Sequence, residues 1–137
     1  MRVIDADGLV LGRMCSTVAK NLLEGEEITI VNADKVLISG NRKSIMEEYE
    51  RSRGQGKVHK GPFYPRMPDS ILKRTVSRMM QHRKAHGKAA MSRLTVHIGV
   101  PPEFKDAKFE KIETAMKADL KKYMTLGDVS RELGAKF

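Results

Sequence analysis

The stretch RVIDADGLVLGRMCSTVAKNLLEGEEITIV, residues 2–31, decides the fold class of this chain. Residues 2–6 contain the β-branched pair Val3-Ile4 and are followed by Asp-Gly, which predicts a short strand and the turn that ends it. Over residues 11–23 apolar side chains recur at steps of three and four, which predicts an amphipathic helix, and Gly25 is its stop signal. Residues 28–31 are β-branched and predict a second strand. A strand, helix and strand of this length imply a parallel crossover and therefore an α/β fold.

Similar patterns predict further elements on either side of the middle of the chain. Residues 36–38 and 94–98 predict a third and a fourth strand, and continuous apolar runs of this kind suit strands buried on both faces. Asn41 is a suitable N-cap for a helix that runs through Tyr49. Residues 125–128 match a capping box ahead of a short C-terminal helix.

The middle of the chain is first irregular and then helical. Gly and Pro residues interrupt residues 51–68 repeatedly, and a loop of this length inside a compact domain is usually functional or disordered. A helix is predicted over residues 70–84, with Asp69 or Ser70 as its N-cap, one apolar face and one basic face. Residues 89–91 predict one further helical turn.

Length and composition limit the class of protein. The 137 residues can bury a hydrophobic core, and no linker divides them, so we expect a single domain over residues 1–137. No apolar run approaches the roughly 20 residues of a transmembrane helix, and the N-terminal residues lack the apolar segment of a secretory signal. Cys15 is the only cysteine. An internal disulfide is therefore excluded, a reducing compartment is favoured, and on the apolar helix face this thiol is expected to be buried and inert.

The net charge of +9 is concentrated in the middle of the chain. Residues 1–50 carry a net charge of −3, and residues 94–137 carry a net charge of +1. Residues 51–93 contain 12 Lys and Arg, three of the four His and a single acidic residue, Asp69, which gives a net charge of +11. Such a segment repels itself unless a polyanion neutralises it, and nucleic acid is the polyanion that this pattern indicates. A solvated basic surface is the alternative.

The basic loop and the helix after it supply most of the candidate RNA contacts. Gly and Pro keep the loop backbone extended, which suits close contact with a large folded RNA. Phe63 and Tyr64 could either stack on exposed bases or pack the loop onto the domain. Arg13, at the start of the first helix, could hold one backbone phosphate. The predicted RNA-binding residues are Arg13, Arg51, Arg53, Lys57, His59, Lys60, Phe63, Tyr64, Arg66, Lys73, Arg74, Arg78, His82, Arg83, Lys84, His86 and Lys88.

An enzymatic alternative rests on Asp5-Ala6-Asp7-Gly8. This stretch looks like the first motif of haloacid-dehalogenase-type phosphatases, in which two carboxylates serve Mg²⁺-dependent phosphoryl transfer. Leu9 stands where those enzymes have Thr, and no later acidic pair has the spacing that Mg²⁺ would need. A turn-building role is therefore favoured. A small Mg²⁺-dependent phosphatase that uses Asp5 and Asp7 is kept as the alternative function.

Metal and cofactor sites have weak sequence support. His82 and His86 lie four positions apart and could share a helical face as metal ligands, but the Arg and Lys residues around them would repel a cation. No glycine motif for dinucleotides or nucleoside triphosphates occurs. We therefore predict no metal, no cofactor and no small-molecule substrate.

Ten short blocks along the chain form an ordered set. They are Ile4-Asp5-Ala6-Asp7-Gly8, Leu11-Gly12-Arg13, Ala19-Lys20-Asn21-Leu22-Leu23-Glu24-Gly25, Ile30-Val31-Asn32-Ala33, Ile38-Ser39-Gly40, Gly61-Pro62, Arg66-Met67-Pro68, Arg74-Thr75-Val76, Arg93-Leu94-Thr95-Val96 and Gly99-Val100-Pro101-Pro102. Each block is weak alone, but the set is specific. Together the blocks resemble the large-subunit ribosomal protein family numbered thirteen, in its archaeal and eukaryotic branch, nearly end to end.

The resemblance implies both a fold and a function. The implied fold is a three-layer α/β/α domain around a four-stranded parallel sheet, to which the basic loop and basic helix are added. The implied function is binding to large-subunit rRNA, early in subunit assembly and without catalysis. Its partners would be this rRNA and neighbouring ribosomal proteins of the cytoplasmic large subunit, with no membrane.

The chain departs from the family pattern in its central segment. Residues 78–82 replace a Gly-Met-Leu-Pro-His run, and without that proline we expect the helix to continue through Gln81. Residues 64–69 replace an aromatic-rich run of the family. Residues 105–122 match nothing in the family and are assigned no role.

Overall fold

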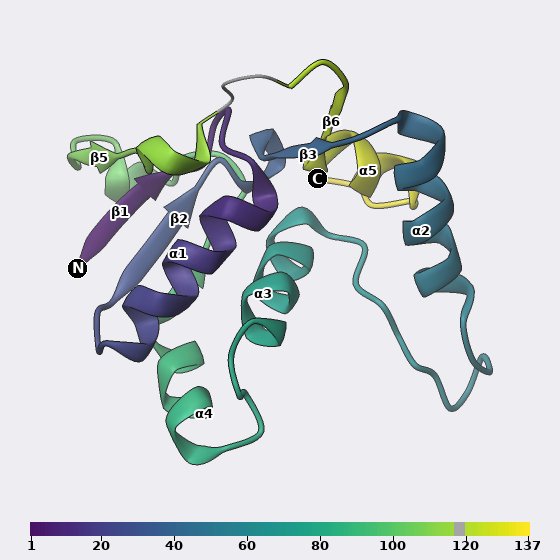
Figure 1. The fold of residues 1–137 in the computed structure, drawn as a ribbon, viewed down its shortest axis with the longest axis horizontal. Helices are drawn as coiled ribbons and strands as arrows, with labels where there is room; N and C mark the ends of the chain where they lie inside the picture. Colours follow the sequence, from purple (N-terminus) through teal and green to yellow (C-terminus); the bar gives the residue numbers. More distant parts are fainter. Residues whose placement is uncertain (117–119) are drawn as a thin grey trace.

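A parallel sheet of four strands forms the centre of the molecule (Figure 1). The computed structural model describes residues 1–116 and 120–137. The strand order is β4-β2-β1-β5, and every pairing in this sheet is parallel. The four strands are β1 (Arg2–Asp5), β2 (Ile28–Val31), β4 (Leu94–Val96) and β5 (Phe109–Glu110). All four residues of β2 are buried although their side chains alternate in direction, as expected of a sheet covered on both faces. This arrangement agrees with the α/β/α expectation.

Helix α1 (Leu11–Leu23) makes the crossover between β1 and β2 and confirms the prediction from the opening stretch. All six apolar residues of its predicted inner face are buried. The chain leaves the helix through Gly25, whose φ of 100° lies in the left-handed region that glycine tolerates. Cys15 is fully buried on this inner face, and desolvation raises the pKa of its thiol to about 12. The thiol is therefore neutral at physiological pH, in line with the expected inert role.

The third predicted strand does not belong to the parallel sheet. After β2, Asn32 adopts a left-handed conformation with φ of 59° and a short 3-10 helix, η1 (Ala33–Lys35), turns the chain away. Strand β3 (Leu37–Ser39) then pairs antiparallel with β6 (Tyr123–Thr125). The fourth parallel strand is instead β5, in the tail that had been assigned no role. An apolar run predicts a strand but not its partner, because pairing depends on residues far away in the chain.

Helix α2 (Arg42–Gly54) begins as predicted, since the side chain of Asn41 accepts a hydrogen bond of 3.2 Å from the backbone N–H of Lys43. It ends later than predicted. Residues 51–54 are helical, so the irregular segment is shorter than the predicted loop over residues 51–68. From here on, residues 55–67 are called the basic loop.

The predicted helix over residues 70–84 is wrong at both ends. Helix α3 (Pro68–Arg78) has Met67 as its N-cap, in place of Asp69 or Ser70, because a proline fits the first helical position, where no N–H is needed. The helix stops at Arg78 and does not continue through Gln81, so a turn over residues 79–84 leads into α4 (Ala85–Ser92).

The C-terminal residues hold α2 in place. Helix α5 (Leu126–Glu132) and β6 form a second, small hydrophobic cluster with α2, and Arg42 of α2 makes an ion pair with Glu132 of α5. Its buried members are Ile45, Met46, Met124 and Val129. The N–H of Leu126 donates a 2.8 Å hydrogen bond to the carbonyl of Val36, so the tail is also tied to the segment between η1 and β3. None of the helices in the described part of the chain combines the length and apolar character that a bilayer crossing requires.

The cap of α5 gives a direct test of this tail structure. The hydroxyl of Thr125 accepts a 3.2 Å hydrogen bond from the N–H of Asp128, which is the first half of the predicted capping box. Thr125→Ala is expected to lower the free energy of unfolding by about 1 kcal/mol, measured by urea unfolding followed by circular dichroism. Thr125→Ser keeps the acceptor and is the matched control. Equal losses in both variants would show that the hydroxyl does not stabilise the helix.

Candidate nucleic-acid interface

Helix α2, the basic loop and helix α3 enclose a continuous hollow in the surface, which we call the α2–α3 groove. The basic loop leaves the end of α2, runs away from the sheet and returns to the start of α3 (Figure 1). Three adjoining cavities make up the groove, and Arg74 and Arg78 of α3 line all three. These two arginines are one helical turn apart, so their side chains lie on the same face of α3.

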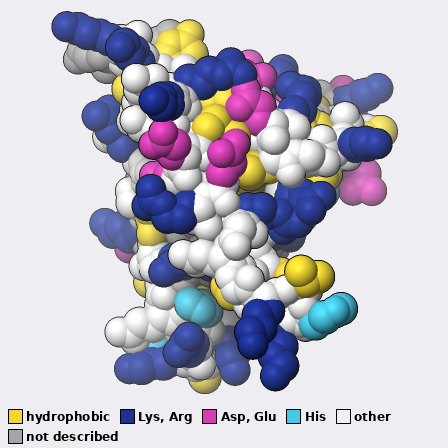
Figure 2. All heavy atoms as spheres, turned by 90° about the vertical axis from the view of Figure 1, so that its right-hand side faces the viewer, with side chains coloured by type: hydrophobic (Ala, Val, Ile, Leu, Met, Phe, Trp, Pro, Cys, Tyr) yellow, Lys and Arg dark blue, Asp and Glu magenta, His cyan; other side chains and the backbone are white. Residues whose placement is uncertain are grey.

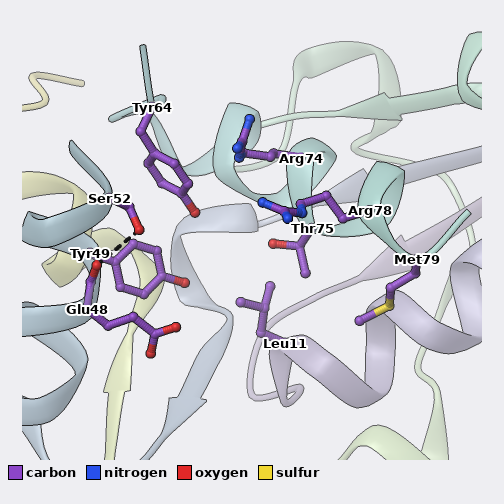
Figure 3. A pocket seen from close by; sticks show the side chains of 9 residues that line it. All are labelled: Leu11, Glu48, Tyr49, Ser52, Tyr64, Arg74, Thr75, Arg78 and Met79. Carbon is purple, nitrogen blue, oxygen red and sulfur yellow. Dashed lines mark hydrogen bonds between the residues drawn. The ribbon is translucent and has the colours of Figure 1, made fainter. Parts of the chain in front are cut away.

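The first cavity lies between α2 and α3 and has a volume of about 330 Å³ (Figure 3). Tyr49 and Tyr64 line one side of it, and Arg74 and Arg78 line the other, while Leu11 reaches it from α1. The remaining lining residues are Glu48, Ser52, Thr75 and Met79. Figure 3 shows polar ends of both tyrosines and both arginines directed into the same space.

Tyr64 is packed into the domain, whereas Phe63 is not. The Tyr64 ring meets Tyr49 edge-on, with centroids 6.0 Å apart, and the guanidinium carbon of Arg74 lies 4.9 Å from the centroid of Tyr64. Burial raises the pKa of the Tyr64 hydroxyl, and the nearby charges of Arg74 and Arg78 oppose that rise. Phe63 leaves 69% of its surface exposed. Of the two predicted roles, packing describes Tyr64, and the ring of Phe63 is accessible for stacking.

A second cavity, of about 300 Å³, continues the groove past the end of α3. It is lined by Arg74, Ser77, Arg78, His82 and Arg83, so the turn after the helix joins the groove. His82 Nδ1 lies 3.0 Å from the carbonyl oxygen of Ser77 and must donate to it, because a carbonyl oxygen can only accept. This bond orients the ring. Three arginines and a histidine around one cavity, with no acidic side chain among its lining residues, form a site suited to a phosphate group.

The basic loop has a defined shape. The guanidinium of Arg53, near the end of α2, donates to the carbonyl of Tyr64 across the loop. Near its tip, Lys57 and Gly61 exchange two backbone hydrogen bonds, of 3.3 and 2.9 Å. Gly56 has a φ of 81°, and a Cβ there would lie 2.0 Å from the carbonyl oxygen of Gly61, so only glycine fits this turn. A further cavity of about 350 Å³ in this loop is lined by both basic and apolar residues, among them Lys57, Arg66 and Phe63.

The other predicted RNA-binding residues line none of these cavities, and all of them except Lys73 are exposed. Figure 2 shows Lys and Arg side chains over the whole of the face that carries the basic loop, whereas the acidic side chains lie mainly in its upper half and the His side chains lie in its lower half. His82 and His86, which by their spacing could have shared a helical face, do not do so, because His82 lies in the turn before α4 and His86 lies inside α4. Lys73 is half-buried on α3. The exposed residues outside the cavities are Arg13, Arg51, His59, Lys60, Lys84, His86 and Lys88.

The groove also contains residues that the sequence did not single out. Ser52 and Gln55 line its middle part together with Phe63. Ser52 lies three positions after Tyr49, and this spacing could have shown that the two residues share one face of α2. No signal in the sequence places Gln55 there, because it depends on how the loop folds back.

The carboxylate of Asp5 takes part in a turn. One oxygen of Asp5 accepts hydrogen bonds from the backbone N–H of Asp7, at 3.0 Å, and from the side-chain amide of Asn32, at 2.9 Å. The other oxygen lies 3.9 Å from Nζ of Lys111. These contacts support the turn-building role and give the phosphatase alternative no support. Within residues 1–116 and 120–137, no group of three or more potential metal ligands was found.

Comparison with known proteins agrees with the sequence resemblance. The family described as ribosomal protein L13 matches residues 1–103. Curated relatives named large ribosomal subunit protein uL13 match along the whole chain. The protein of Methanococcoides burtonii is 52% identical and that of Methanosarcina barkeri 51% identical, each with full coverage of both chains. The protein of Thermoplasma acidophilum is 45% identical, with 98% of each chain covered. The chain therefore belongs to the ribosomal protein L13 family.

Proposed function

We propose that this protein is a structural constituent of the large ribosomal subunit that binds the rRNA of that subunit and does not catalyse a reaction. The observation that carries the proposal is the full-length match to relatives named as large-subunit ribosomal proteins. The proposal places the protein in the cytoplasm, with rRNA and neighbouring ribosomal proteins as its partners.

The mechanism is charge neutralisation combined with fixed shape. The parallel sheet and its helices form a platform, and the α2–α3 groove presents arginines from a helix on one side and a folded loop on the other. Phosphates of neighbouring RNA segments repel one another, so cations held between them lower the cost of packing the segments together. Because the basic side chains are attached to a folded domain, they also fix the positions that these phosphates occupy.

The structure supports different roles for different members of the predicted set. Arg74, Arg78, Arg83 and His82 line one cavity, which supports a role for them in binding phosphate. The exposed cations outside the cavities add long-range attraction to the RNA. Tyr64 acts indirectly, since it positions the guanidinium of Arg74.

Sedimentation of cell extract on a sucrose gradient tests this function. Nearly all of the protein is expected to travel with the large ribosomal subunit, and to leave it when the subunit is unfolded by removal of Mg²⁺ and addition of salt. A dominant pool at the top of the gradient, in intact extract, would instead indicate a nucleic-acid-binding protein that works outside the ribosome.

A further inference from the structure

The middle part of the α2–α3 groove is a small recess of about 160 Å³. It lies between the end of α2, the basic loop and α3, and it opens beside the arginine-lined cavity because Arg74 and Arg78 line both. We call it the Phe63 recess. Its lining residues are Ser52, Gln55, Pro62, Phe63, Tyr64, Arg74 and Arg78.

The side chains of this recess differ in chemistry from a simple phosphate site. Phe63 offers an aromatic ring that is 69% exposed, whereas the ring of the next residue, Tyr64, packs edge-on against Tyr49. Gln55 is exposed beside it and carries both a hydrogen-bond donor and an acceptor on one amide. An aromatic face next to an amide matches a nucleobase, which has a π-face and a polar edge.

The adjoining cavity, which is lined by arginines, suits the anionic phosphate of a nucleotide. Arg78 lines both the recess and the cavity that also contains His82 and Arg83. A ligand that spans the two places would carry a flat, polar-edged ring at one end and an anion at the other. A nucleotide has this composition. Bases within a duplex are stacked and paired, so the nucleotide must come from a loop, a bulge or a strand end.

We propose that the Phe63 recess binds one unstacked nucleotide of RNA, with its base on the ring of Phe63 and its phosphate against Arg74, Arg78 and Arg83. This inference rests on the proposed function, because it names the kind of RNA element that the groove takes. It adds a base-binding position to a surface that would otherwise contact only the RNA backbone.

Ultraviolet cross-linking tests the position of the base. The wild-type protein is bound to transcribed large-subunit rRNA, irradiated, digested, and analysed by mass spectrometry for peptides that carry a nucleotide. A cross-link on Phe63 is expected. Binding with cross-links only at other residues would overturn this inference and leave the proposed function standing, whereas failure of the wild-type protein to bind the rRNA would overturn both.

Variants of Phe63 provide a second, quantitative measurement. Phe63→Leu is expected to weaken rRNA binding about tenfold while the slope of affinity against salt stays unchanged, because stacking releases no counterions. Phe63→Tyr keeps an aromatic ring and should restore binding. Phe137→Leu is the control, since Phe137 is an exposed aromatic residue stacked on Arg131 outside the groove. Circular dichroism checks that each variant is folded.

Free nucleotide separates RNA from a small-molecule ligand. Adenosine monophosphate at 1 mM is expected to compete poorly with the rRNA, because the exposed cations outside the recess bind only the longer polyanion. Displacement of the rRNA by this nucleotide, or equal affinity of Phe63→Leu and wild-type protein for the rRNA, would overturn the proposal.

Discussion

Replacement of Arg74 and Arg78 together by Gln is expected to weaken binding to large-subunit rRNA by about 100-fold or more. Each charge-assisted hydrogen bond to a phosphate contributes roughly 1.5–3 kcal/mol, and tenfold in affinity corresponds to about 1.4 kcal/mol. Loss of two phosphate contacts should also reduce the slope of log affinity against log salt by about 1.4–1.8. Filter binding at several salt concentrations measures both quantities.

The fold should survive this double substitution. Nε of Arg74 is buried without a hydrogen-bond partner in the described part of the chain, so its loss breaks no bond of that atom. The contact with the ring of Tyr64 is worth about 0.5–1 kcal/mol. Lys105→Gln with Lys136→Gln removes the same charge from exposed positions outside the groove and is the control. If both pairs weaken binding equally, net charge and not the groove determines affinity.

Gly87→Ala is expected to destabilise the protein by about 2 kcal/mol, although alanine is the better helix former by roughly 1 kcal/mol. Gly87 lies inside α4, and a Cβ there would lie 2.0 Å from the carbonyl oxygen of Gln81 and 2.9 Å from Cα of His82. These are backbone atoms, so the clash can be relieved only by a shift of the whole turn. Urea unfolding followed by circular dichroism measures the change, since the chain has no Trp.

Gly12→Ala is the matched comparison for this effect. Gly12 is also a helical glycine, in α1, but a Cβ there would meet no atom within 4 Å. It should therefore leave stability unchanged or raise it slightly. A stabilising Gly87→Ala would show that the turn over residues 79–84 is not held against α4. A destabilised variant should also bind rRNA less tightly, because His82 and Arg83 lie in that turn.

The elements predicted best from the sequence are those whose signals lie within one short stretch of the chain. Both ends of helix α1 were predicted correctly. Its apolar periodicity, its glycine stop signal and its buried face are all encoded within 15 consecutive positions. The predicted end of α3 was wrong because the helical pattern continues past Arg78, whereas the chain turns there and its backbone at Gln81 and His82 packs against Gly87 of α4, a contact that no periodicity shows. β5 was missed because a two-residue strand carries no periodicity.

The residues of the candidate site could be predicted from the sequence, but their arrangement around a groove could not. Charge counting identified the segment that carries Arg74, Arg78 and the loop residues, since a run of cations is visible without coordinates. The groove exists only because α2 lies opposite α3, and α2 is held there by β6 and α5 from the other end of the chain. The ring of Tyr64 is packed whereas that of Phe63 is exposed. This difference likewise depends on Tyr49 and Arg74, which come from the two opposing helices.

The bonds within the basic loop determine which partner must change on binding. Arg53 holds the loop to Tyr64 by a hydrogen bond, and Lys57 is hydrogen-bonded to Gly61. Much of the conformational entropy of this segment is therefore lost when the protein folds and not when it binds. The remaining ordering falls on the RNA. An RNA segment exchanges between several conformations, and the protein binds most tightly the one that fits its preformed surface. The population of that conformation rises by an amount that the difference in affinity sets. Where the loop binds RNA as proposed, we therefore expect it to act as a template that selects one RNA conformation.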